Sequence, residues 1–323
     1  MSIYESVVAY LLNDLSFEVW PELRMILERI EAKKPRDWKL PMRVCEAVGG
    51  STEQAIPASS AIACAQIGIV LIDDMLDEDP RGEYLRVGVA QAANFSSAFQ
   101  SLGGKAVLES SALPKTKILV LHVLNQMLTD VAYGQHLDAQ NAPSEIAYWR
   151  IVRRKSASFF GAALQVGALF GEADVEIAEK IKQIGGLYGE MIQLHDDLND
   201  TMAVPANPDW IQGRLPLPIL FAQTVEHAER ARFLELRRRI THEDALLEAQ
   251  DILIRCGAVS YCVDQILRRH QAAQEIIAAL LLPNRDVLDA LIEEVVAPVW
   301  KLFDAVGVSQ PRSVIPSGRG ARA

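Results

Sequence analysis

The sequence predicts an all-α protein, and this prediction rests on three observations. Apolar residues recur at intervals of three and four along nearly the whole chain, whereas the alternating pattern of β-strands is scarce. Hydrophobic residues make up 50% of the 323 positions, which suffices for one sizeable core. No linker rich in proline, glycine and serine divides the middle of the chain, and we find no tandem repeat. We therefore expect residues 1–305 to form a single helical domain.

Breaks in the apolar periodicity give the helix boundaries. Glycine and proline residues support these breaks at 49–50, 103–104, 141–144, 204–210 and 282–284. The predicted helices span residues 2–32, 36–48, 54–78, 84–101, 114–140, 143–171, 174–203, 213–237, 242–256, 258–280 and 285–305. The remaining segment, 306–323, is rich in proline, glycine and serine and lacks periodicity, so we expect a disordered C-terminal tail.

Charge and composition argue against several classes of protein. The formal net charge is −10 and the pI is about 5.2, which disfavours nucleic-acid binding through phosphate contacts. The N-terminus carries Glu5 and Asp14 and no basic segment, so we expect no secretory signal. The uncharged run 156–171 is shorter than the ~20 residues that a membrane span needs, and we expect no span. The four cysteines lack zinc-ligand spacing, and we expect them to be reduced in a cytoplasmic protein.

Five acidic residues crowd into the seven positions from Asp73 to Asp79, directly after an apolar stretch. On a helix, Asp73 and Asp77 are four residues apart and share one face, with Asp74 beside them. Like charges this close repel one another, so the cluster lowers stability unless a cation neutralises it. Taken alone, such a cluster can also be a helix end whose acids point into water.

A second cluster has the same DDxxD spacing, at Asp196, Asp197 and Asp200, and it also ends an apolar run. Two such helices can meet at the mouth of an apolar pocket, with their carboxylates facing one another. Mg²⁺ prefers carboxylate and water oxygens and completes its coordination with phosphate oxygens of a substrate. We therefore expect a helical bundle with a central apolar pocket that binds a Mg²⁺–diphosphate bearing an apolar tail.

These motifs resemble those of the trans-isoprenyl diphosphate synthases, or polyprenyl synthetases, of the isoprenoid synthase superfamily. The resemblance covers roughly residues 35–225. It rests on "DDMLD" followed by "RG", on "YGQHLD" at 133–138, on "RRKSASFFGAALQVGAL" at 153–169, and on "HDDLND" followed by "GRLPLPI". It implies an all-α isoprenoid synthase fold with the active site inside the bundle, and a homodimer.

The resemblance also implies a role for each aspartate of the two motifs. Asp73 and Asp77, with Asp74 beside them, would bind two Mg²⁺ ions from one side of the pocket. Asp196 would bind a third ion from the other side. The remaining two aspartates of the second motif, Asp197 and Asp200, would be further ligands or would orient them.

Four further residues would act on the substrate if the resemblance holds. Lys155 and Arg214 would grip the diphosphate, Arg214 standing where the family has a lysine. Gln135 and Gln193 would position ligands or the reacting tail. Plainer alternatives exist for three of these residues: Lys155 could belong to a solvated basic face, Gln135 to the core, and Arg214 to the surface at a helix start.

The segment that would bind a second substrate departs from the family pattern. In the family, isopentenyl diphosphate binds to a "GGKRxRP" segment, a histidine seven residues before the first motif, and a pair of arginines after it. With Pro41 as the anchor, Asp37 stands in the lysine position and Gln66 replaces the histidine. Only Arg81 remains of the arginine pair, and an aspartate repels a diphosphate.

Three functions therefore stay open on sequence grounds. The leading expectation is an enzyme that ionises one allylic prenyl diphosphate and then cyclises or rearranges the cation, or transfers it to a non-standard acceptor. Ordinary chain elongation is the second, and it would need a second site rebuilt from Arg36, Lys39 or Arg43. A non-catalytic subunit of a heteromeric synthase is the third; such subunits usually lose aspartates, which this chain retains.

Overall fold

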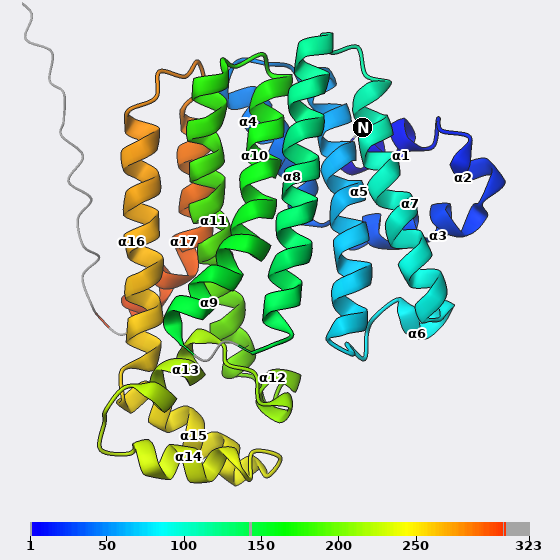
Figure 1. The fold of residues 1–323 in the computed structure, drawn as a ribbon. Coiled ribbons are helices and arrows are strands. Elements are labelled where there is room, and N and C mark those ends of the chain that lie inside the picture. Colours follow the sequence, from blue (N-terminus) through cyan, green and yellow to red (C-terminus); the bar gives the residue numbers. More distant parts are fainter. Residues whose placement is uncertain (1, 142–143, 306, 308–323) are drawn as a thin grey trace, which may run out of the picture.

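The computed structural model describes residues 2–141, 144–305 and 307, and every regular element within these ranges is a helix (Figure 1). The elements are α1 (Ile3–Leu11), α2 (Ser16–Val19), α3 (Pro21–Glu31), the 3₁₀ turn η1 (Arg36–Lys39), α4 (Leu40–Ala47), α5 (Thr52–Leu76), α6 (Tyr84–Val87), α7 (Val89–Leu108), α8 (Pro114–Asp138), α9 (Glu145–Val152), the π-helical turn η2 (Arg153–Ala157), α10 (Ser158–Phe170), α11 (Val175–Thr201), α12 (Pro208–Gln212), α13 (Leu217–Thr224), α14 (Arg230–Arg237), α15 (Glu243–Arg255), α16 (Ala258–Ala278) and α17 (Asp286–Ala305). The predicted fold class is confirmed. The tail predicted at 306–323 lies, apart from Gly307, outside the described residues.

Four of the predicted helices are interrupted in the structure. The helix expected over 84–101 is divided at Gly88 into α6 and α7, and α7 continues to Leu108 through the break expected at 103–104. The helix expected over 2–32 is divided into α1, α2 and α3, and Pro21 begins α3 because it has no N–H to donate to a preceding turn. The helix expected over 143–171 contains η2, and that over 213–237 is broken where Val225 is extended. Conversely, α12 begins inside the break expected at 204–210, where Pro208 starts the helix and the side chain of Asn207 accepts from the Asp209 N–H.

The helix α5 lies between two hydrophobic clusters. One cluster joins apolar side chains of α4, α8, α10, α11, α16 and α17 to one side of α5. The other packs α1, α3 and α7 against its opposite side. A helix buried on both sides must be apolar all round, which explains the run of alanine, isoleucine and serine along α5.

The same composition makes α5 long and apolar enough to cross a membrane by length and hydropathy alone. Its uncharged run, residues 54–72, is longer than the run at 156–171 considered above. However, 72% of its apolar window is buried inside the bundle, as in the core helix of a globular domain.

The two helices that carry the acidic motifs run toward the same end of the bundle. Both α5 and α11 end near α12 and the loop that follows it, at the lower end of the view in Figure 1. This parallel course brings two motifs that are distant in sequence to one end of the molecule. A smaller hydrophobic cluster joins α12–α15, and α14 and α15 lie at the lower left of Figure 1.

Candidate active site

The first acidic motif lies at the C-terminus of α5. Asp73 and Asp74 occupy its last turn and Asp77 is its C-cap, whose N–H donates to the Asp73 carbonyl at 2.9 Å. The C-terminus of a helix carries partial negative charge, so acidic side chains are unfavourable there. The cluster therefore depends on cations supplied by other elements.

Lys155 supplies one of these cations. Its Nζ lies 3.1 Å from Oδ1 of Asp73 and 2.7 Å from Oδ2 of Asp138, and Gln135 Nε2 donates to the same Asp73 oxygen at 2.9 Å. Burial pulls the pKa of Lys155 down, but the carboxylates of Asp73 and Asp138 outweigh it and raise the pKa above its ordinary value. With only 19% of its side chain exposed, Lys155 does not belong to a solvated face.

The local backbone explains how Lys155 reaches this position. It lies in the π-helical turn η2, which interrupts the α-helical register between α9 and α10. Gly134 of α8 lets this turn approach closely, because a Cβ there would lie 2.9 Å from the Lys155 backbone nitrogen. The glycine of "YGQHLD" is therefore required for close packing of α8 against η2.

Arg214 supplies the second cation. Its Nη2 donates to Oδ1 of Asp77 at 2.6 Å, and its Nη1 lies 3.8 Å from Asp209. Its backbone N–H donates to the Asp209 carbonyl at 2.8 Å, which fixes the loop between α12 and α13. Its side chain is 26% exposed and pairs with Asp77 at the end of α5, so it is no isolated surface residue.

The second motif places its middle aspartate in the protein interior. Asp197 is 5% exposed, and its Oδ2 accepts from the Tyr148 hydroxyl at 2.7 Å and from the Leu217 N–H at 2.9 Å. Its Oδ1 accepts from Gln193 Nε2 at 2.9 Å, and Ser156 Oγ donates to Gln193 Oε1 at 2.7 Å. Through these bonds, Asp197 and Gln193 hold α9, η2 and α13 against α11.

The other two aspartates of the second motif differ from Asp197 in their contacts. The described residues donate no hydrogen bond to Asp196 within bonding distance, and burial raises its pKa to about 6 although the Arg36 charge opposes this. Burial likewise raises the pKa of Asp200, while Asn207 and Arg81 act in the opposite direction. Both carboxylates are therefore placed where a further cation would stabilise their charge.

Asp74 and Arg81 differ in their exposure, although both lie close to the other acids of the first motif. Burial raises the pKa of Asp74 to about 6, and the charges of Asp79 and Asp73 add to this. The Arg81 side chain is 88% exposed and bonds to Asp79 at 2.8 Å. The structure thus does not bring Arg81 to Lys155 or Arg214, although its charge reaches Asp200.

The chemistry of these donors fits Mg²⁺ held together with a diphosphate. Within residues 2–141, 144–305 and 307, no three acidic, histidine or cysteine side chains converge as a preformed metal cage. Mg²⁺ needs no such cage, because it keeps several waters and takes only one or two carboxylates plus substrate phosphates. Asp73, Asp77, Asp196 and Asp200 offer hard carboxylate oxygens from two helix ends, as such binding requires.

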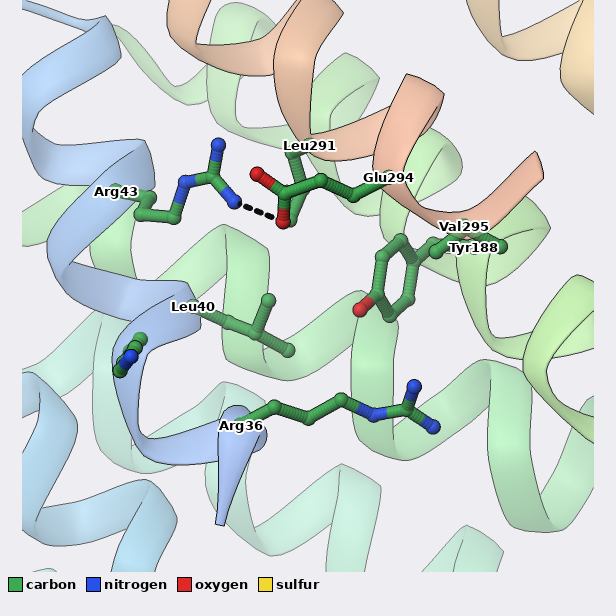
Figure 2. Close-up of a pocket in the computed structure, with 8 residues that line it drawn as sticks. Arg36, Leu40, Arg43, Tyr188, Leu291, Glu294 and Val295 are labelled. Atoms are coloured by element: carbon green, nitrogen blue, oxygen red, sulfur yellow. Dashed lines mark hydrogen bonds and ion pairs between the residues drawn. The ribbon is translucent and has the colours of Figure 1, made fainter. Parts of the chain in front are cut away.

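A separate basic cavity lies beside the second motif. It has a volume of about 490 Å³ and lies between η1, α4, α11 and α17 (Figure 2). Arg36, Lys39 and Arg43 are among its lining residues. Next to it, Gln66 Nε2 donates to Asp37 Oδ2 at 2.6 Å and Trp38 Nε1 donates to Gln66 Oε1 at 2.7 Å.

Sequence reasoning missed three residues of this region. Asp138, the second partner of Lys155, is the last residue of "YGQHLD", three positions after Gln135. Their i, i+3 spacing on one helix face was an available signal. No sequence pattern gave Tyr148 or Tyr188 a role, because aromatics at helical spacing usually belong to the core.

Comparison with known proteins agrees with the fold and the motifs. The polyprenyl synthetase family model matches residues 31–253. The geranylgeranyl diphosphate synthase of Methanosarcina mazei is 27% identical over 53% of this chain and 54% of the relative, so the chain spans about half of that protein. The nonaprenyl diphosphate synthase of Mycobacterium tuberculosis is 24% identical over 74% of this chain and 75% of the relative.

A solved structure shows the same fold over nearly the whole chain. The geranylgeranyl pyrophosphate synthetase of Pyrococcus horikoshii superposes with a TM-score of 0.77 at 22% identity, covering 91% of this chain and 98% of that one. The matched family segment contains both aspartate motifs, Lys155 and Arg214. The chain belongs to the polyprenyl synthetase family.

Proposed function

We propose that this chain is a Mg²⁺-dependent prenyl diphosphate synthase, which ionises an allylic prenyl diphosphate and lengthens it with isopentenyl diphosphate. The observation that supports ionisation is the pairing of Lys155 with Asp73 and of Arg214 with Asp77. These cations flank the two aspartates on one turn of α5, where a diphosphate and its metal ions would displace the internal ion pairs. The relatives' names, which are those of chain-elongating synthases, favour elongation over the cyclisation or transfer expected from the sequence.

The chemistry needs stabilisation of a leaving group and shelter for a cation. When the allylic C–O bond breaks, its electron pair stays on the diphosphate, and Lys155 and Arg214 offset that added negative charge. Bound Mg²⁺, held by Asp73, Asp77, Asp196 and Asp200, would supply further Lewis-acid stabilisation. The double bond of isopentenyl diphosphate then forms the new C–C bond, and a proton leaves the adjacent carbon to the released diphosphate.

The test is product analysis with purified protein and Mg²⁺. Geranyl, farnesyl and geranylgeranyl diphosphate are each supplied with and without isopentenyl diphosphate, and products are identified by mass spectrometry. We expect longer diphosphates only when isopentenyl diphosphate is present, and their loss in Asp73→Ala or on chelation of Mg²⁺. A hydrocarbon or alcohol formed from the allylic substrate alone would contradict elongation.

The single-substrate reaction is the second candidate, and one observation favours it. Asp37 and Gln66, which stand where the family has a lysine and a histidine, bond to each other and contribute no positive charge of their own. Without a place for a second diphosphate, the cation would be cyclised, rearranged or passed to another acceptor. The same product analysis separates the two candidates.

We further propose a cytoplasmic homodimer with three Mg²⁺ ions per site. All four cysteines are free in the structure, as expected of a protein from a reducing compartment. Three apolar side chains are exposed where α7 leads into α8. Leu108 at the end of α7 is 57% exposed, Leu113 just before α8 is 65% exposed, and Ile118 in α8 is 68% exposed. Their burial in a dimer is testable by sedimentation equilibrium, where Ile118→Glu should yield monomers.

A further inference from the structure

A buried ion pair lies beside the π-helical turn that carries Lys155. It joins Glu190 of α11 to Arg269 of the neighbouring helix α16, whose Nε donates to Glu190 Oε2 at 2.6 Å. Only 11% of each side chain is exposed. The other oxygen of Glu190, Oε1, lies 3.4 Å from Nε of Arg153, the first residue of η2. One buried carboxylate therefore connects α16 to η2.

Further contacts fix the position of Arg269. Its Nη1 donates to the Gln265 carbonyl at 3.1 Å and to Oε1 of the same residue at 2.8 Å. Its guanidinium carbon lies 3.9 Å from the centroid of the Trp149 ring, on α9 just before η2. The ring quadrupole attracts a guanidinium over its face, most strongly away from water. Arg269 thus contacts the helix before η2 directly and η2 itself through Glu190.

A second contact joins α11 to η2 nearer the end of the turn. Ser156 Oγ donates to Gln193 Oε1 at 2.7 Å. Gln193 is three residues after Glu190, so both side chains lie on one face of α11. Gly189 allows α11 to come this close, because a Cβ there would lie 2.6 Å from the Ser156 carbonyl oxygen. One face of α11 therefore holds η2 at Arg153 and at Ser156.

Lys155 lies between these two attached residues. Its Nζ reaches Asp138 of α8 at 2.7 Å and Asp73 of α5 at 3.1 Å. A π-helical turn inserts one residue into an α-helix. Return of η2 to the α-helical register would rotate the residues on one side of the turn by about 100° relative to those on the other. Contacts that hold η2 therefore also determine where the Lys155 ammonium points.

We propose that Glu190 and Arg269 are positioning residues for Lys155, and that with Trp149 they hold η2 so that the ammonium meets the leaving diphosphate. They act through η2 and not on the substrate itself. The proposal rests on the proposed function, in which Lys155 stabilises that leaving group. Desolvation makes a buried ion pair costly compared with apolar side chains of similar volume, so its presence here calls for a role other than stability.

A double variant separates positioning from stability. Glu190→Gln alone would leave Arg269 buried without its counter-charge, so a loss of activity would not distinguish misplacement from unfolding. Glu190→Met, Arg269→Met replaces the pair by apolar side chains, an exchange that often preserves stability. We expect its melting temperature to stay close to that of the wild type. Should it not fold, Arg269→Lys carries the test, because it keeps the charge and loses the forked geometry.

Hydrogen exchange measures the order of η2 without any substrate. We expect the η2 amides to exchange about 10-fold faster or more in the double variant, because a contact that closes this segment is lost. The amides of α5 should exchange as in the wild type. Arg232→Met, Glu248→Met is the matched control, since it removes a pair at 2.6 Å between α14 and α15 and should leave η2 unchanged.

Kinetics then test whether the pair acts through Lys155. In the double variant, kcat for elongation should fall by about 10-fold or more, because misplacing a reacting group by ~1 Å can cost ~100-fold. KM for the allylic substrate should change by less than about threefold, since Arg214 and the metal ions still bind the ground state. In a Lys155→Met background, the same two substitutions should lower kcat by less than about twofold, because no ammonium remains to be positioned.

Each outcome decides a different claim. Exchange of η2 at the wild-type rate in the folded variant would overturn the inference whatever the activity. Faster exchange with unchanged kcat, or an equal fall of kcat in the Lys155→Met background, would overturn the positioning role. Faster exchange in a protein whose wild type makes no longer diphosphate would support the hold on η2 and overturn the proposed function.

Discussion

Arg214 donates to Asp77 at 2.6 Å and so joins the loop before α13 to the end of α5. The two residues are 137 positions apart in the chain. The bond connects both acidic motifs, because the same loop leads into α13, whose Leu217 N–H donates to Asp197. Because Arg214 contacts the first motif and lies in the segment that contacts the second, its substitution tests both.

Arg214→Ala should lower kcat/KM for the allylic substrate by roughly 100-fold, because a charge-stabilising donor is lost from the developing diphosphate. Arg214→Lys should lose less, since the charge remains while the forked geometry is lost. Steady-state kinetics at saturating Mg²⁺ measure both effects. Wild-type rates in Arg214→Ala would show that the guanidinium serves only the loop.

Lys155→Met should impair both stability and activity. Without the ammonium, the carboxylates of Asp73 and Asp138 lose their shared counter-charge, and we expect the free energy of unfolding to fall by about 1–3 kcal/mol. Urea denaturation measures this change. A Lys155→Met, Asp138→Asn double variant should recover stability but not turnover, which separates the ion pair from its role toward substrate.

Tyr148→Phe tests whether Asp197 positions the second motif. The substitution removes one of three donors to a buried carboxylate, and we expect a loss of about 1–2 kcal/mol in the free energy of unfolding. Because Leu217 and Gln193 still hold Asp197, we expect kcat to fall while KM for the allylic substrate changes little. Tyr261→Phe, at a solvent-accessible bond to Glu145, is the matched control.

Asp37→Asn should stabilise the protein relative to the wild type, and this gain should be larger at neutral pH than at acidic pH. Burial raises the folded-state pKa of Asp37 from 3.8 to about 6, and the Arg36 charge only partly opposes this. Folding therefore favours the protonated carboxyl, and stability falls as pH rises from about 4 through about 6. The full effect is roughly 3 kcal/mol.

Urea denaturation at pH 4.5 and pH 8 measures the Asp37 effect. The gain in Asp37→Asn should be larger at pH 8, where the wild-type side chain is ionised in both states. Asparagine keeps the acceptor for Gln66, so the hydrogen bond at 2.6 Å is preserved. The same difference between variant and wild type at both pH values would show that Asp37 titrates normally in the folded protein.

The sequence alone determined the fold class, most helices and the two acidic motifs. Helical periodicity is a local property, and the DDxxD spacing places Asp73 and Asp77 on one face whatever surrounds them. The motifs singled out Asp73, Gln135 and Lys155, but the bonds of Lys155 and Gln135 to the same Asp73 oxygen came only from the tertiary structure. The interruptions at Pro21, Gly88, η2 and Val225 were not foreseen, because boundaries depend on caps and packing beyond the local pattern.

Only the tertiary structure decided which way each polar side chain faces. The motif gives Asp196 and Asp197 the same chemistry, yet Asp197 points to Tyr148 and Leu217 while Asp196 does not. Likewise, the sequence places Asp37 where the family binds a diphosphate. The structure shows that Asp37 bonds to Gln66, and that Arg36 and Arg43 line a cavity next to it. The type of a residue determines which charge it can carry. Whether it carries that charge in the folded protein depends on its burial and its bonding partners, and these are often distant in the sequence.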